Sequence, residues 1–141
     1  MESSTFSDTS APAPEQTAVM VLATLSLCHF LNDTMQSLLA ALYPVFKDNY
    51  GLTFTQIGLI TFTFQVTASL LQPLVGASMD RHPRPRLLSV GMGSTLVGLL
   101  VLAWAGHYWL LVAASAMVGL GSAIFHPESS RIARAASGGR H

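Results

Sequence analysis

The sequence predicts an all-α fold, a polytopic bundle of four transmembrane helices. Half of the 141 residues are apolar and only 10% are charged, and the few charges leave long stretches of the chain uncharged. Soluble domains carry about 25% charged residues, so this chain lacks the charged surface that a soluble fold needs. The uncharged stretches instead have the length and hydrophobicity of membrane spans.

The charge balance excludes two further classes of protein. Seven Lys and Arg residues offset seven Asp and Glu residues, which gives a formal net charge of zero. A nucleic-acid-binding protein needs surplus positive charge to neutralise phosphates, and a disordered protein combines low hydrophobicity with high net charge. We therefore expect no nucleic-acid partner. The single cysteine, Cys28, indicates neither a disulfide framework nor a Cys-based metal site, and we assign no metal and no cofactor.

The uncharged stretches divide into four spans. About 20 apolar residues in a helix cross the roughly 30 Å of hydrocarbon in a bilayer. The stretch 87–127 has 41 residues, which is too long for one crossing. We expect it to turn back at Gly106–His107, because the Trp and Tyr residues on either side favour the membrane–water interface. The predicted spans are about 18–46, 53–78, 87–105 and 108–128.

Residues 1–16 precede the first span and differ from it in composition. They are rich in Ser, Thr, Pro and Ala and contain three of the seven acidic residues. This composition predicts a disordered, solvated tail. The remaining residues, 17–141, form the transmembrane part of the chain.

The first span carries polar residues at membrane depth. His29, Asn32, Asp33 and Gln36 lie at positions i, i+3, i+4 and i+7, which share one face of a helix. A carboxylate at mid-span is too costly to place against lipid. We therefore expect this face to point into the bundle interior or a water-filled cavity. A mid-membrane carboxylate beside an imidazole suits a proton-coupled carrier. In the alternative interpretation, Asn32 or Asp33 caps a helix break or bonds a neighbouring helix.

The second span contains many Thr and Gln residues. Threonine hydroxyls return hydrogen bonds to their own helix, so most of them predict nothing specific. Gln65 lies at mid-span and is the candidate for a cavity. Pro73 removes a helical hydrogen bond and should kink or loosen the helix near its cytoplasmic end.

The third and fourth spans predict helix packing. The third span is apolar on every side, which is a membrane pattern. The fourth has a row of small residues, Ser115, Gly119 and Ala123, which lets another helix approach closely. At the end of that span Glu128 lies near the cytoplasmic face, where we expect it to pair with an Arg of the 80–86 link; in the alternative interpretation it is an interfacial charge in headgroup water.

The distribution of Lys and Arg predicts the orientation in the membrane. The 80–86 link contains three Arg, and the segment after the fourth span contains three more. The other two links contain only Lys47. Because basic residues collect on the cytoplasmic side, we expect the N-terminus, the 80–86 link and the C-terminal segment in the cytoplasm.

The link after the second span contains a family motif. Residues 76–86 read GASMDRHPRPR, which resembles the G-x-x-x-D-R-x-G-R-R loop between the second and third helices of the major facilitator superfamily. Gly76, Asp80, Arg81 and Arg84 match the motif. Proline replaces its second Gly, and another proline separates its paired Arg.

Three other segments, 29–44, 54–76 and 124–141, resemble the fosmidomycin-resistance branch of this superfamily, a group of bacterial efflux proteins. The resemblance covers residues 18–141. It implies a carrier of the bacterial inner membrane that exports small compounds in exchange for protons. It also implies a conformational latch at the cytoplasmic ends of the helices, formed by Gly76, Asp80, Arg81 and Arg84 with Glu128 as their partner.

One position departs from the superfamily pattern. Many of its proton-driven exporters place an Arg four residues before a Gly in the fourth span. Here Ser115 stands at that spacing before Gly119. The titrating function would then fall to His29, Asp33 or His126.

The length also departs from the superfamily, whose members have twelve spans in two halves with the substrate site between them. The resemblance implies that this chain holds the first four helices of the N-terminal half, as a truncated or incompletely sequenced product. Transport is then the function of the parent protein. Its partners are the bilayer, protons, a small-molecule substrate and helices five to twelve, and we expect the 141 residues to be inactive alone.

Other functions fit parts of the sequence. A four-span multidrug exporter acting as a homodimer would use Asp33, but the 80–86 link argues against it. A non-transporting scaffold or assembly protein suits the small-residue faces but gives His29, Asp33 and Gln36 no role beyond packing. We do not expect an enzyme, because the only candidate pair is His29 with Asp33, and His126 is expected a turn or more of membrane away.

Overall fold

The computed structural model describes residues 14–81 and 86–138, and within these ranges every element is an α-helix. The prediction of an all-α fold is therefore confirmed. The helices are α1 (Pro14–Ala41), α2 (Tyr43–Tyr50), α3 (Phe54–Arg81), α4 (Leu87–Ala103) and α5 (Tyr108–Ala136).

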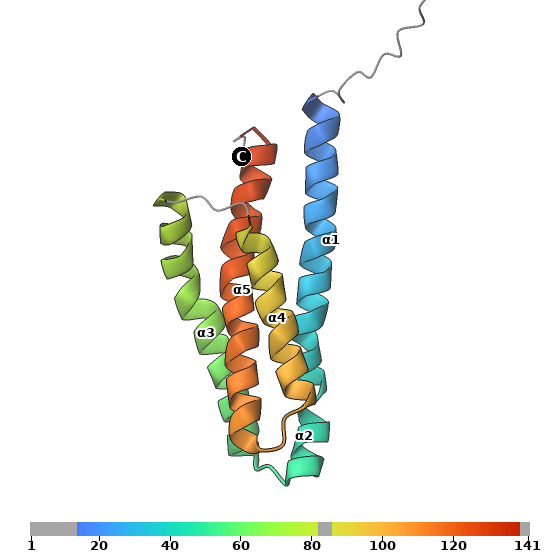
Figure 1. Ribbon diagram of the computed structural model, residues 1–141, viewed down its shortest axis with the longest axis vertical. Helices are drawn as coiled ribbons and strands as arrows, with labels where there is room; N and C mark the ends of the chain where they lie inside the picture. Colours follow the sequence, from blue (N-terminus) through green and yellow to red (C-terminus); the bar gives the residue numbers. More distant parts are fainter. Residues whose placement is uncertain (1–13, 82–85, 139–141) are drawn as a thin grey trace, which may run out of the picture.

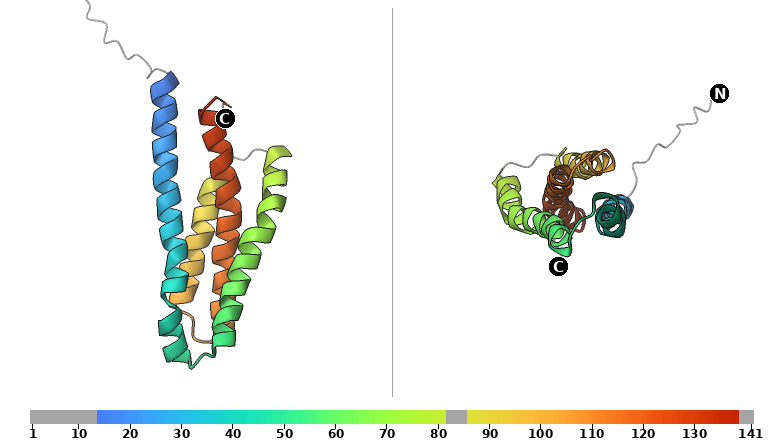
Figure 2. Two further views of the ribbon diagram at one scale, coloured as in Figure 1. Left: turned by 180° about the vertical axis from the view of Figure 1, so that it is seen from behind. Right: turned by 90° about the horizontal axis from the view of Figure 1, so that it is seen from below.

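The helices form an antiparallel bundle of four passes (Figure 1). The N-terminal end of α1, the C-terminal end of α3 and the C-terminal end of α5 lie at one end of the bundle, and α2 lies at the other. Seen from behind and from below, α5 runs between α3 and α4 (Figure 2). It packs extensively against both, whereas α1 packs less extensively against α5 and α4.

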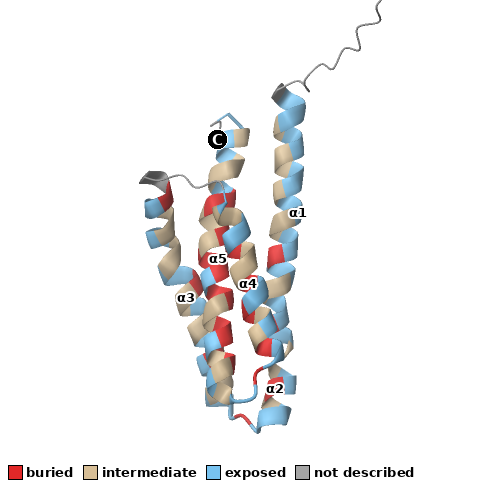
Figure 3. Ribbon diagram, viewed as in Figure 1, coloured by how far each residue is buried: buried red, intermediate tan, exposed pale blue. Residues whose placement is uncertain are grey.

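The outer surface of the bundle is apolar. Side chains such as Phe30, Phe54, Leu74 and Trp104 are exposed, while the buried residues concentrate along α5 (Figure 3). Three helical stretches, Glu15–Tyr50, Phe54–Met79 and Tyr108–Ala136, are long and apolar enough to cross a membrane, and α4 is a shorter apolar helix of 17 residues. So large an apolar surface is suited to lipid, and the chain is a multi-pass membrane protein.

The first predicted span, 18–46, is divided in the structure. Helix α1 ends at Ala41 and α2 begins at Tyr43, because Pro44 in the first turn of α2 has no N–H to continue the α1 hydrogen-bond pattern. At its other end α1 begins at Pro14, so the last three residues of the predicted tail are helical. The rest of that tail, 1–13, lies outside the described residues.

The turns between helices are fixed by local hydrogen bonds. Gly51 ends α2 with a φ of 59°, a left-handed conformation that glycine adopts at little cost. Thr53 and Gln56 form a capping box before α3, because the Gln56 side chain accepts from the Thr53 N–H at 2.8 Å. His107 caps α5 by accepting from the Leu110 N–H at 3.3 Å. The predicted reversal at Gly106–His107 is confirmed.

Two helices continue past the ends that the sequence predicts. Helix α3 runs through Pro73 to Arg81, and α5 runs through Pro127 to Ala136 instead of ending near 128. The turn after Pro127 is held by a pair between Glu128 and Arg131 at 2.6 Å, a spacing of i and i+3 that a helix favours. Residues 129–136, which the sequence prediction places after the fourth span, therefore form about two further helical turns.

Glycines let α5 lie close to both of its neighbours. A Cβ on Gly121 would lie 2.7 Å from the Gly91 carbonyl oxygen and from the Thr95 nitrogen, both on α4. A Cβ on Gly119 would lie 2.7 Å from the Phe64 carbonyl oxygen on α3. The small-residue row predicted for the fourth span therefore includes a point of close backbone approach.

We predict that Gly121→Ala destabilises the bundle, because the added methyl group meets backbone atoms of Gly91 and Thr95 on α4 as well as the Thr95 hydroxyl. The expected loss is about 1–3 kcal/mol of unfolding free energy, as for other overpacked sites. The loss would be measured by denaturant titration in detergent micelles, followed by circular dichroism.

Gly93→Ala is the matched control, because a Cβ at Gly93 has no atom within 4 Å. It makes the same chemical change in a transmembrane helix without the close contact. Equal stabilities for the two variants would show that the close approach at Gly121 does not limit packing.

Candidate functional site: a histidine–aspartate cluster between two helices

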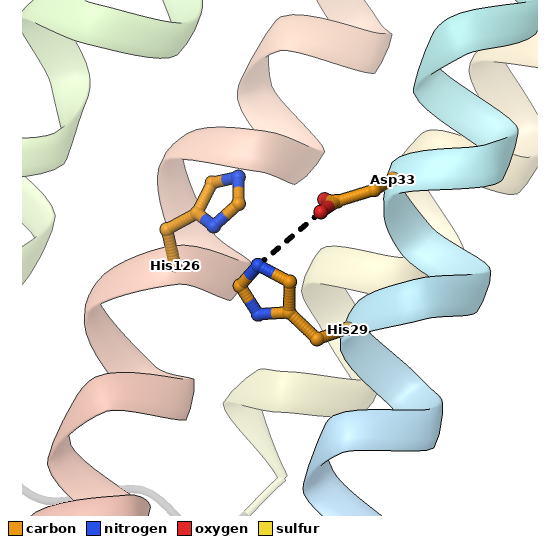
Figure 4. Close-up of side chains that lie close together, drawn as sticks. All are labelled: His29, Asp33 and His126. Carbon is orange, nitrogen blue, oxygen red and sulfur yellow. Dashed lines mark ion pairs between the residues drawn. The ribbon is translucent and has the colours of Figure 1, made fainter.

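His29, Asp33 and His126 form a cluster between α1 and α5 (Figure 4). The His29 Nε2 and Asp33 Oδ2 atoms lie 3.3 Å apart. The rings of His29 and His126 have their centroids 5.0 Å apart. One ligand-type atom from each residue lies within 4.8 Å of those from the other two. Two titratable groups of α1 therefore meet a third on a helix more than 90 residues later in the chain.

The position expected for His126, a turn or more of membrane away from His29, is wrong. That expectation placed His126 near the cytoplasmic end of its helix. Because α5 continues to Ala136, His126 lies well inside the helix, beside the middle of α1. The structure therefore adds His126 to the two residues that share a face of α1.

The two helices orient the cluster in different ways. His29 and Asp33 are one helical turn apart, so both side chains leave α1 in the same direction. The His29 ring also meets the edge of Phe125 at a centroid distance of 5.4 Å. Phe125 is fully buried, so it gives the imidazole a fixed surface to pack on.

One side of the cluster is open in this chain. The side chains of His29 and Asp33 are 43% and 51% exposed. A cleft of about 230 Å³ adjoins His29, and its polar lining includes Ser26, Ser129 and Ser130. The carboxylate thus faces α5 on one side and open space on the other.

The other polar residues of the α1 stripe have different surroundings. Asn32 is fully buried, and its side-chain oxygen accepts from the Thr95 hydroxyl of α4 at 3.4 Å. Asn32 therefore bonds a neighbouring helix, as in the alternative interpretation of its sequence position. The side-chain nitrogens of Asn32 and Gln36 are buried without a hydrogen-bond partner in the part of the chain that the structure describes.

Gln65 and the expected latch residues lie elsewhere. Gln65 is exposed on α3. Gly76 lies beside α5, where a Cβ would be 3.7 Å from the Cβ of Pro127. The remaining latch positions have side chains outside the described residues, namely Asp80, Arg81 and Arg84.

Glu128 is fully buried and pairs with Arg131 of its own helix. Its two carboxylate oxygens accept from the Arg131 Nε at 2.9 Å and Nη2 at 2.6 Å. A two-point contact of this kind is among the strongest pairings available to a carboxylate. The partner that the sequence predicts, an Arg of the 80–86 link, includes Arg81 and Arg84, whose side chains lie outside the described residues. The spacing of three residues was the signal for Arg131, but the prediction of a helix ending near 128 concealed it.

Comparisons with known proteins agree with this architecture. The family model described as Major Facilitator Superfamily matches residues 25–141. The chain is 53% identical over 126 residues to the fosmidomycin resistance protein of Escherichia coli (strain K12). It is 42% identical over 125 residues to the uncharacterized MFS-type transporter YfnC of Bacillus subtilis (strain 168). Each alignment covers 89% of this chain and 31% of the relative. No solved structure matches significantly.

We predict that Arg131→Met destabilises the protein by about 3–5 kcal/mol, because it leaves a buried carboxylate without its cation. Adding Glu128→Gln to this variant removes the charge and should recover part of the loss. Denaturant titrations of both single variants and the double variant in detergent measure these effects.

Arg134→Met is the control for this series, because Arg134 is exposed on the same helix. Removing its exposed charge should change the free energy of unfolding only slightly. A double variant no more stable than Arg131→Met alone would contradict the importance of the buried charge.

Proposed function

Because this chain belongs to the major facilitator superfamily, we propose that the whole protein is a secondary active transporter that exports small compounds in exchange for protons. In this proposal the 141 residues supply the first four transmembrane helices, and the protein is a transporter and not an enzyme. One relative carries fosmidomycin resistance in its name. That name supports an antibiotic-like compound as the exported substrate.

The cluster of His29, Asp33 and His126 is the observation that carries this proposal. A carboxylate and two imidazoles this close together can receive a proton and pass it between them. The cluster is built by two helices, so a shift of α1 against α5 changes which groups are in contact. Protonation and helix packing are thereby coupled, as proton-driven transport requires.

The remaining polar residues of α1 are proposed to bind substrate. The Gln36 side-chain nitrogen is buried and has no partner among the described residues. A buried donor left unpaired costs about 1–3 kcal/mol, and a hydrogen bond to substrate would remove that cost. The Asn32 nitrogen offers a second donor. Gln65, which is exposed on α3, is proposed to line the substrate cavity together with Asn32 and Gln36.

We also propose that the cytoplasmic ends of α3 and α5 form a latch that stabilises one access state. Gly76 lies beside Pro127, next to the buried Glu128. A change in how α3 packs on α5 at this point would also shift the Glu128–Arg131 pair. The family motif supports the other latch residues, Asp80, Arg81 and Arg84.

The lengths of the relatives favour this carrier over the alternatives. The chain spans about a third of the curated relatives that it matches, 31% in each alignment. A cavity between two halves needs helices five to twelve, which are partners in this proposal together with the bilayer and protons. A four-span homodimer or a non-transporting scaffold has no comparable support.

Six of the seven Lys and Arg residues support a cytoplasmic N-terminus in the bacterial inner membrane. Those six lie in the 80–86 link or from residue 131 onward. The C-terminal end of α3, which leads into the 80–86 link, and the C-terminal end of α5 lie at the end of the bundle at which α1 begins (Figure 1). That end is therefore proposed to face the cytoplasm.

We predict that Asp33→Asn in the full-length protein abolishes proton-coupled export, because the amide cannot carry the proton. Everted membrane vesicles loaded with a pH-sensitive dye would report proton movement when fosmidomycin is added. The variant should still insert and should lose the fosmidomycin-induced signal.

Thr34→Ala is the matched control for Asp33→Asn. Thr34 is exposed beside Asp33, and its hydroxyl donates to the Phe30 carbonyl of its own helix at 2.8 Å. Unchanged proton movement in Asp33→Asn would remove this carboxylate from the coupling mechanism.

The proposed orientation predicts the labelling of single cysteines in a Cys28→Ser background. A His107→Cys variant should react with a membrane-impermeant maleimide on intact cells whose outer membrane has been permeabilised. An Arg86→Cys variant should react only after the inner membrane is opened. The reverse pattern would contradict a cytoplasmic N-terminus.

A further inference from the structure

We propose that His29, Asp33 and His126 form a binding site for Zn²⁺ that joins α1 to α5. No metal site is expected from the sequence, because the third ligand lies far along the chain. The structure brings two imidazoles and one carboxylate within 4.8 Å of one another. This ligand set, two His and one Asp, is one that Zn²⁺ favours over the oxygen-preferring Mg²⁺ and Ca²⁺.

The geometry suits a tetrahedral ion. Zn²⁺ binds nitrogen at about 2.0–2.1 Å and carboxylate oxygen at about 2.0–2.2 Å, so neighbouring ligand atoms in a tetrahedral site are about 3.4 Å apart. The His29 Nε2 and Asp33 Oδ2 atoms are already 3.3 Å apart. The His126 ring is near enough for a side-chain rotation to bring its nitrogen into the third position.

The surroundings provide both support and access. Phe125 makes T-shaped ring contacts with His29 and His126 and limits their movement. The cleft lined by His29, Ser129 and Ser130 gives an ion a path to the cluster. Three protein ligands leave a fourth position for water or another small ligand.

The position of the site predicts its physical effect. Helix α1 packs less extensively against the rest of the bundle than α3 and α4 do, and none of residues 15–28 is buried. Zn²⁺ at this level would connect α1 directly to α5, the helix at the centre of the bundle (Figure 2). Because the ion binds only the folded arrangement, it should also raise the thermal stability of the protein.

The test uses the full-length protein, purified in detergent and stripped of metal. Competition with a chromophoric chelator measures the affinity for Zn²⁺, and visible absorption of bound Co²⁺ reports a tetrahedral site. We expect His126→Ala and Asp33→Asn each to weaken Zn²⁺ binding by at least about tenfold and to remove the tetrahedral Co²⁺ spectrum. The zinc-induced rise in melting temperature should disappear with them.

His107→Asn is the control, because His107 is a histidine at the far end of the bundle and Asn preserves its role as a helix cap. It should bind Zn²⁺ as the unmodified protein does. His126→Gln provides a second variant that keeps a polar side chain of similar size, should His126→Ala not fold.

Zn²⁺ affinity unchanged in His126→Gln or Asp33→Asn, or a protein that binds no Zn²⁺, would overturn the inference. These measurements require no transport. If the protein exports with proton coupling but does not bind Zn²⁺, only the proposed metal site is wrong. If it binds Zn²⁺ but shows no proton coupling, only the proposed transport mechanism is wrong.

Discussion

The close approach of α5 to α3 and α4 is the constraint on which the rest of the structure depends. Gly119 and Gly121 place the α5 backbone so near both neighbours that a single methyl group would meet backbone atoms. In a bilayer the lipid is as apolar as the side chains, so the hydrophobic effect does not drive helices together. Close packing of this kind holds them together instead. It makes α5 the central helix, against which the cluster of His29, Asp33 and His126 is built.

The cluster depends on that central position. Phe125, His126 and Glu128 follow one another at the same level of α5, where the first is buried in the core, the second faces α1 and the third is held by Arg131. One helical segment thereby supplies a packing surface, a titratable group and a buried ion pair. A movement of α5 against α1 would change the contacts of Phe125 and His126 with His29, while Glu128 and Arg131 would move together, which suits a protein proposed to alternate between access states.

The sequence predicted most of the fold for reasons that lie within single segments. Hydropathy and charge located the four passes, and glycine with aromatic neighbours located the reversal at Gly106–His107. Local chemistry also explains the errors. Pro44 divides the first span, and the pair of Glu128 with Arg131 extends α5 past Pro127. The apolar pattern locates a helical stretch, but it does not show whether the helix ends at a proline or continues through it, because that depends on the hydrogen bonds around the proline.

The sequence by itself determined that the chain crosses a membrane, and which face of α1 carries His29 and Asp33, because helical spacing is a property of one segment. Only the tertiary structure decided that His126 joins them and that Asn32 turns instead to Thr95. Those outcomes depend on how far one helix is displaced along another. That displacement is set by packing between residues far apart in the chain, and no pattern within either helix encodes it.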